Sequence, residues 1–103
     1  MSKVAVIAKI TTVSGERDAV VEVLREVVAA VSAEPGTLVY AMNTDRANPD
    51  VIWSYELYTD DAALAAHGTG EAMKVAGPRL GGKMAGRPEL FTLDMVANKG
   101  LPG

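Results

Sequence analysis

Cysteine is absent from the 103-residue chain, and histidine, tryptophan and phenylalanine each occur once. Without cysteine, the chain has no disulfide, no thiolate nucleophile and no thiolate ligand for a metal. No second histidine accompanies the first, and no recognisable nucleophile has a base beside it. Residues 51–67 hold the only tryptophan, the only histidine and two of the three tyrosines. We therefore expect any chemistry to begin in this stretch.

Long apolar runs and an excess of basic residues are also missing. No run approaches the roughly 20 apolar residues needed to cross a bilayer, so we expect no membrane association. Ten basic against thirteen acidic residues give a net charge of −3, which offers no footprint for nucleic acid. Lys9 interrupts the first apolar run and no small-residue cleavage site follows, so we expect a cytoplasmic protein without a secretory signal.

The length fits a single domain of residues 1–103 with a core of about residues 3–97. A strand is predicted over residues 3–12, followed by a helix over residues 16–33 that Ser14 is placed to cap. Glu34-Pro35-Gly36 then ends the helix.

The second half repeats the pattern after a hairpin. Strands are predicted over residues 37–44 and 51–58, joined by a turn-rich loop. Asp60 is expected to cap a helix that reaches His67. The glycines of residues 68–70 then break this helix, and a shorter helix follows and ends ahead of Pro78. A last strand is predicted over residues 89–97. This order predicts an α+β fold of ferredoxin-like βαββαβ topology, with a four-stranded antiparallel sheet.

Both faces of the predicted sheet are apolar. Val6 and Ala8 on one side of the first strand are matched by Ala5 and Ile7 on the other. Two helices can cover only one face, so the second would be a large exposed apolar patch. We expect an obligate homodimer in which two sheets pack face to face. The alternative is a monomer whose residues 98–103 fold over the sheet, although this segment is short and polar.

Several short sequence motifs follow one another in a specific order. Glu34-Pro35-Gly36 precedes Tyr40, and Tyr55-Glu56-x-Tyr58-x-Asp60 leads into Ala63-Leu64-x-x-His67. Through these motifs and the predicted topology, the chain resembles the antibiotic biosynthesis monooxygenase family from about residue 3 to residue 96. The family consists of small dimeric α+β barrels.

The resemblance implies a cofactor-independent monooxygenase that uses O2 to oxidise an electron-rich aromatic, such as a hydroquinone, an anthrone or a polyketide phenol. The substrate would supply the electrons and leave as a quinone-type product. The protein would supply a dry pocket, a proton acceptor and orientation. The alternative is a small-molecule-binding stress-response dimer that keeps the scaffold without the chemistry.

A third alternative is a relative that binds or degrades haem. Haem-degrading members of the superfamily use an asparagine, a tryptophan and a histidine at positions that correspond here to Ala8, Tyr58 and Gly77. None of the three matches, so the resemblance disfavours this route.

Three residues are candidates for catalysis. His67 is the one side chain whose unperturbed pKa lies near neutrality, and it occupies the family's histidine position; otherwise it packs at the helix end against a backbone carbonyl. Tyr58 is expected to orient a substrate oxygen or to be a buried aromatic. Glu56, on the same strand face, is either a base or, as we favour, a carboxylate held by a backbone or arginine partner. Whether His67 or Glu56 accepts the proton stays open.

The expected substrate-binding residues are Tyr40, Met42, Ser54 and Met73. Trp53 and Tyr55 resemble a ligand-stacking pair but alternate to the other face, so we assign them to the dimer interface.

The glycine-rich segments at residues 68–70 and 81–86 are either movable parts of a cavity mouth or plain helix punctuation. The segment from Gly77 to Lys83 copies most of a phosphate-binding loop, but Met84 replaces the hydroxyl residue, which excludes nucleotide binding. Arg79, Lys83 and Arg87 either steer an anionic substrate or form a solvated surface.

Overall fold

Four antiparallel strands form one sheet in the computed structural model, which describes residues 3–102. The strands are β1 (Val4–Thr11), β2 (Thr37–Thr44), β3 (Val51–Tyr58) and β4 (Glu89–Asp94). They lie in the order β2-β3-β1-β4. Crossovers between β1 and β2 and between β3 and β4 carry the helices, so the predicted ferredoxin-like α+β topology is confirmed.

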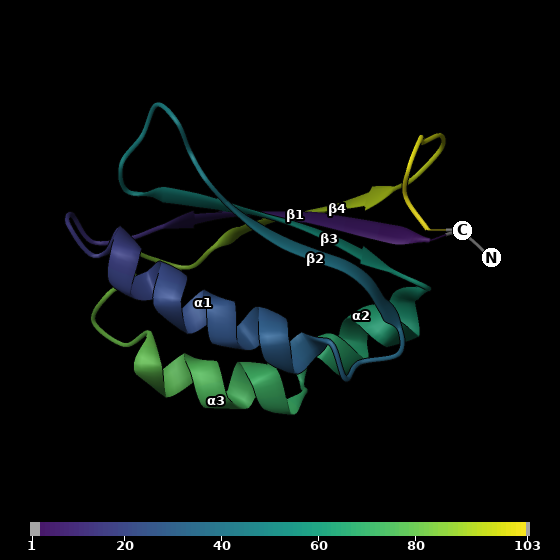
Figure 1. The fold of residues 1–103 in the computed structure, drawn as a ribbon, viewed down its shortest axis with the longest axis horizontal. Helices are drawn as coiled ribbons and strands as arrows, with labels where there is room; N and C mark the ends of the chain where they lie inside the picture. Colours follow the sequence, from purple (N-terminus) through teal and green to yellow (C-terminus); the bar gives the residue numbers. More distant parts are fainter. Residues whose placement is uncertain (1–2, 103) are drawn as a thin grey trace.

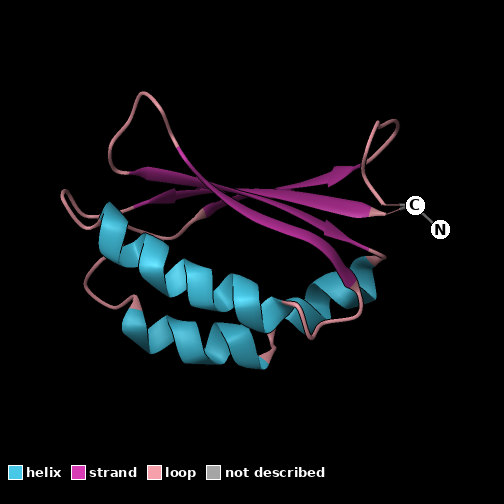
Figure 2. Cartoon of the chain, in the orientation of Figure 1, coloured by secondary structure: helices cyan, strands magenta, loops and turns pink. Residues whose placement is uncertain are grey.

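The three helices are α1 (Arg17–Val31), α2 (Asp61–Gly68) and α3 (Glu71–Arg79). All three lie on one face of the sheet, with α1 and α3 side by side and α2 at one end (Figure 1, Figure 2). Among residues 3–102, no helix has both the length and the apolar character that crossing a bilayer would need.

Helix α1 starts and ends inside the predicted bounds. Its N-cap residue is Glu16 rather than the expected Ser14, and no side chain caps its first turn. The acidic Asp18 in that turn is favourable for the helix dipole. At the other end, the hydroxyl of Ser32 donates to the carbonyl of Ala29 at 2.6 Å. This bond competes with helix continuation, which explains why α1 stops before residue 33.

Helix α3 continues past the proline that was expected to end it. Pro78 lies inside the last turn of α3, which extends to Arg79. A proline normally forces the preceding residue out of the helical region by a clash with its Cβ. That residue is Gly77, which has no Cβ, so the helix can continue through Pro78 to Arg79.

Strand β4 is shorter than predicted, because its partner ends. The pairing of β1 with β4 finishes at Val4 opposite Asp94, and Val4 is the first residue of β1. Met95 and its successors therefore have no β1 residue to pair with.

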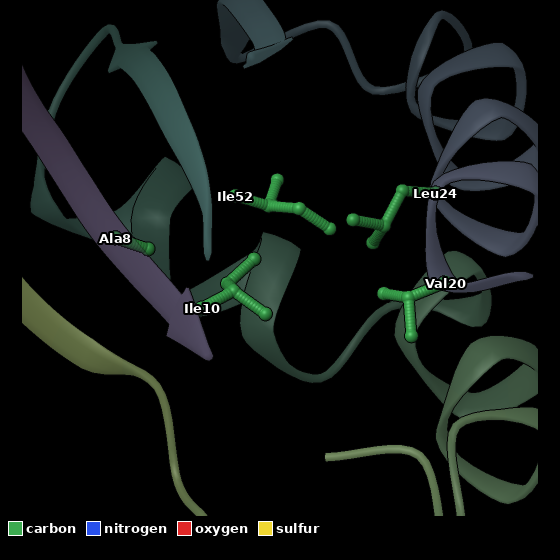
Figure 3. Packing of buried hydrophobic residues seen from close by; sticks show 5 residues of the cluster. All are labelled: Ala8, Ile10, Val20, Leu24 and Ile52. Carbon is green, nitrogen blue, oxygen red and sulfur yellow. The ribbon is translucent and has the colours of Figure 1, made fainter. Parts of the chain in front are cut away.

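The core lies between the sheet and the helices. Figure 3 shows its first cluster, in which side chains from β1, β3 and α1 point toward one another: Ala8, Ile10, Val20, Leu24 and Ile52. A second cluster joins α1 to α3 through Val23, Val27, Val31, Ala72 and Ala76. The partly buried Leu80 packs against both clusters. This double contact holds α1 and α3 as one layer.

The face of the sheet away from the helices is only partly covered. Phe91 is 47% exposed and Leu93 is 44% exposed on β4, next to the half-buried Ile7 of β1. The segment after β4 rises from this face at one end of the sheet (Figure 1). It leaves most of the apolar surface open, and Val96 within it is itself 96% exposed.

Candidate active site

A cavity of about 230 Å³ lies between the sheet and the helix layer. Most of its wall is aliphatic, and four of the five residues in Figure 3 contribute to it. The side chains with polar atoms on the wall are Tyr40, Ser54, Glu56 and His67. An apolar cavity with a few convergent polar groups is the usual form of a small-molecule site.

Alternation along β3 brings two of these polar groups to the cavity. Ile52, Ser54, Glu56 and Tyr58 share the face toward the helices, and Ser54 and Glu56 line the cavity. The Ser54 hydroxyl accepts from the backbone N–H of Ala8 at 3.2 Å, which ties this part of the wall to β1.

Glu56 is only 7% exposed, and two hydroxyls hold its carboxylate. Ser54 Oγ donates to Oε2 at 2.7 Å, and the Tyr58 hydroxyl donates to Oε1 at 2.5 Å. The expectation of a backbone or arginine partner was therefore wrong. Residues two positions apart on one strand face are neighbours, so the strand itself supplies both donors.

Tyr58 lies behind the cavity wall. It is completely buried, it does not line the cavity, and its hydroxyl is engaged with Glu56. Burial, followed by the bond to the Glu56 carboxylate, raises the pKa of Tyr58 far above its ordinary value. Tyr58 therefore stays a hydrogen-bond donor to Glu56 at any physiological pH.

His67 lies in the last turn of α2 and is 6% exposed. Asp60 caps this helix as predicted, with Oδ1 accepting from the N–H of Ala63 at 2.9 Å. His67 Nδ1 lies 2.9 Å from Glu34 Oε1, so its partner is a carboxylate and not the backbone carbonyl that the sequence suggested. Thr37 Oγ1 donates to the same Glu34 oxygen at 2.8 Å.

The Glu34 contact fixes the role of each imidazole nitrogen. A carboxylate can only accept, so Nδ1 carries the proton in the neutral ring and Nε2 has a free lone pair. Within residues 3–102, Nε2 has no hydrogen-bond partner, and His67 lines the cavity. The neutral imidazole thus keeps one ring nitrogen free to accept a proton, on a residue that lines the cavity.

Glu34 is a candidate site residue that the sequence alone did not indicate. It was assigned only to the turn that ends α1. Its position depends on Gly36, where an added Cβ would lie 2.5 Å from the Cβ of Ala63 in α2. The backbone N–H of Thr59 also donates to the Gly36 carbonyl at 3.0 Å. The Glu34-Pro35-Gly36 turn is therefore packed directly against α2, which explains how Glu34 reaches His67.

Two tyrosine rings flank the imidazole. The centroid of His67 lies 4.9 Å from that of Tyr40 and 5.6 Å from that of Tyr58. Burial, with the nearby carboxylates of Glu56 and Glu34, raises the pKa of Tyr40 well above its ordinary value. Its hydroxyl, which has no partner among the described residues, is therefore a neutral donor or acceptor beside the cavity.

The other expected substrate-binding residues also lie on the wall. Met42 of β2 and Met73 of α3 both line the cavity, and Met73 is 37% exposed. The structure thus brings His67, Glu56, Tyr40, Met42, Ser54 and Met73 together around one space, with Tyr58 behind them.

Trp53 and Tyr55 point to the opposite face, since they alternate with Ser54 and Glu56 on β3. The indole Nε1 of Trp53 donates to Asp45 Oδ2 at 2.7 Å, and Lys9 Nζ lies 5.8 Å from the ring centroid. Neither residue can contact a ligand in the cavity.

Cations are absent from the wall of this cavity in the part of the chain that the structure describes. Arg79 instead pairs with Glu26 on the outer surface, at 2.7 Å. Residues 3–102 also contain no cluster of three or more side chains that is suited to hold a metal ion.

Comparison with known proteins decides the family. A family model described as antibiotic biosynthesis monooxygenase matches residues 3–79. The chain belongs to this family.

Solved structures agree with this assignment. A Caulobacter crescentus protein proposed to be an antibiotic biosynthesis monooxygenase is 31% identical, with 93% of this chain and 92% of that chain covered and a TM-score of 0.87. PA3566 from Pseudomonas aeruginosa is 28% identical, with 94% and 97% covered and a TM-score of 0.86. A Chloroflexus aurantiacus protein, proposed to have the same activity as the Caulobacter protein, is 26% identical, with 98% and 100% covered and a TM-score of 0.84. No curated protein matches the chain. Family membership supports a general monooxygenase role.

Proposed function

We propose that the protein is a cofactor-independent monooxygenase that oxidises an electron-rich phenol, such as a hydroquinone, with O2 to a quinone-type product. The observation that carries this proposal is the Glu34–His67 pair at the cavity wall, with Nδ1 held at 2.9 Å and Nε2 free. Family membership supports the reaction type, and the apolar wall supports an aromatic substrate.

In the proposed first step, His67 Nε2 accepts the proton of the phenol hydroxyl. The phenolate then transfers one electron to O2, and superoxide combines with the ring radical at a C–H carbon ortho or para to the oxygen. The peroxide anion that forms takes the proton back from the His67 imidazolium to give a hydroperoxide, and Nε2 then accepts that carbon's proton while the O–O bond breaks. The departing hydroxide takes a proton from the His67 imidazolium and leaves as water. One oxygen atom is left on the ring as a carbonyl, and the other is in water.

The surrounding residues have positioning roles in this scheme. Glu34 holds the tautomer in which Nε2 is the acceptor, as a carboxylate does in other histidine bases. Tyr58 and Ser54 hold Glu56, whose carboxylate lies on the wall as an acceptor for a second substrate hydroxyl. His67 is preferred to Glu56 as the base, because both Glu56 oxygens already accept a hydrogen bond.

The test is oxygen uptake by the His67→Ala variant with a hydroquinone substrate. Loss of a general base is expected to lower kcat at least about 100-fold, and added imidazole is expected to restore part of the rate. The matched control is Thr69→Ala, two positions after His67 at the exposed end of α2, which should retain wild-type turnover. An unchanged rate in folded His67→Ala would remove His67 from this role. Ligand binding without oxygen uptake in the wild type would favour a binding protein instead.

We also propose a homodimer formed through the open face of the sheet. The exposed Phe91 and Leu93 lie on this face with the half-buried Ile7, Trp53 and Tyr55. Aromatic and aliphatic side chains gathered on one face are typical of an obligate interface, which buries roughly 2,000 Å² or more.

A further inference from the structure

We infer that the cavity selects uncharged aromatic ligands of one or two rings that carry a hydroxyl donor, and that Glu56 is the residue that excludes anionic ligands. This inference rests on the proposed function, because it takes the same cavity as the substrate site. It adds the charge and the size class of the substrate, which the reaction type leaves open.

Among the described residues, the cavity wall carries a carboxylate and no lysine or arginine. Glu56 and His67 are the only ionisable side chains other than tyrosine among the described residues that line the cavity. Behind His67 lies a second carboxylate, that of Glu34. A carboxylate or phosphate on a ligand would therefore be placed near two carboxylates, and the one group on the wall that can become a cation, His67, is already paired with Glu34. In an apolar space such an arrangement strongly disfavours binding.

Hydrogen bonding adds a second criterion. A carboxylate offers about four lone-pair sites, and Ser54 and Tyr58 occupy one on each oxygen of Glu56. The sites that remain can only accept. His67 Nε2 is likewise an acceptor when Nδ1 holds its proton against Glu34. A ligand hydroxyl matches these groups, whereas an ether or a carbonyl at the same place leaves them unpaired.

Size sets the upper limit. The cavity of about 230 Å³ is smaller than the roughly 300–1,000 Å³ of sites for drug-sized ligands. Core residues of β1, α1 and α3, such as Ala8, Leu24 and Ala76, make the inner part of its wall, whereas Leu90 on the same wall is 66% exposed. Interiors of this kind are close-packed and resist expansion. We therefore expect one or two fused rings to fit within the cavity, and a four-ring system to bind more weakly because part of it would lie outside the close-packed wall.

The experiment measures equilibrium binding in the absence of oxygen, by NMR titration of the full chain. The probes are 6-hydroxy-2-naphthamide and 6-hydroxy-2-naphthoate, which share ring, hydroxyl and shape and differ in charge. The amide is expected to bind at least about tenfold more tightly. In the Glu56→Gln variant, this ratio is expected to fall below about threefold, mainly because the naphthoate binds better. Glu71→Gln, on the exposed start of α3, is the matched control and should keep the wild-type ratio.

Equal or tighter binding of the naphthoate to the wild type would overturn the inference, and so would failure of both probes to bind. Binding of 1-hydroxypyrene, which has four rings, as tightly as the amide would overturn the size limit. The wild-type comparison needs no variant, so it decides the charge rule even if Glu56→Gln does not fold. Because oxygen is excluded, the outcome is independent of whether the protein oxygenates anything.

Discussion

At the scale of single residues, the buried Glu56 carboxylate is the most demanding feature of the site. Burying a carboxylate costs several kcal/mol unless hydrogen bonds replace water. Here two hydroxyls of the same strand face supply them, at 2.7 Å from Ser54 and 2.5 Å from Tyr58. Glu56 is thereby held as an acceptor without a cation beside it.

Removing one of these donors should measurably destabilise the fold. Tyr58→Phe keeps the buried ring and deletes the hydroxyl, so Glu56 loses one partner. We expect the free energy of unfolding, from urea titration, to fall by about 2 kcal/mol. Tyr55→Phe makes the same change on the opposite face of β3 and should stay within about 0.5 kcal/mol of wild type. Equal stability of the two variants would show that Glu56 does not depend on Tyr58.

For single residues, the sequence predicted the face on which a side chain lies but not the partner that it contacts. The alternation along β3 correctly placed Ser54, Glu56 and Tyr58 on the helix-covered face, because the side-chain period of a strand is fixed. It did not identify the partners of Glu56. Glu34 was missed as a partner of His67, since the two are 33 positions apart and meet only through tertiary packing.

At the scale of elements, the Glu34-Pro35-Gly36 turn and helix α2 form one packed unit. Gly36 permits the close approach, because a Cβ there would lie 2.5 Å from the Cβ of Ala63. The turn delivers Glu34, and α2 delivers His67. Glycine at position 36 is therefore a requirement of the site as well as of the turn.

Gly36→Ala is expected to push the turn away from α2. We expect a loss of about 1–3 kcal/mol in the free energy of unfolding, as for other overpacked positions. Gly86→Ala, where an added Cβ meets nothing within 4 Å, is the matched control. In the double variant Gly36→Ala/Ala63→Gly the clash is removed, so the effects of the two changes should not add. Strict additivity would contradict a direct contact between the turn and α2.

Element boundaries were predicted well where one local interaction dominates and less well elsewhere. Asp60 caps α2 as its side-chain chemistry indicates. The end of α3 differed because Gly77 removes the usual restriction before Pro78. The end of β4 depends on where β1 begins, which is a property of the sheet and not of residues 89–97 alone.

At the scale of the whole molecule, the helices cover one face of the sheet and leave an apolar face on the other side (Figure 1). The sequence predicted this imbalance from the strand pattern and from the number of helices. The homodimer that would cover the face stays a prediction.

Phe91→Asp is expected to disrupt that dimer. A carboxylate within an apolar interface is left without a partner, whereas a single chain already exposes 47% of Phe91. Multi-angle light scattering at micromolar concentration should give twice the chain mass for wild type and one chain mass for the variant. Val75→Asp, at an exposed position of α3, should stay dimeric. A wild-type protein that elutes as a monomer would contradict the prediction.

The central claim is that the chain inserts one atom of O2 into a phenol without a cofactor. The most direct measurement is mass spectrometry of the product formed under ¹⁸O2 by chelator-treated protein with a panel of hydroquinones, against heat-denatured protein to correct for autoxidation. We predict saturable turnover and one ¹⁸O atom in each product molecule. Turnover no faster than the denatured control, or an unlabelled quinone formed with hydrogen peroxide, would contradict the claim.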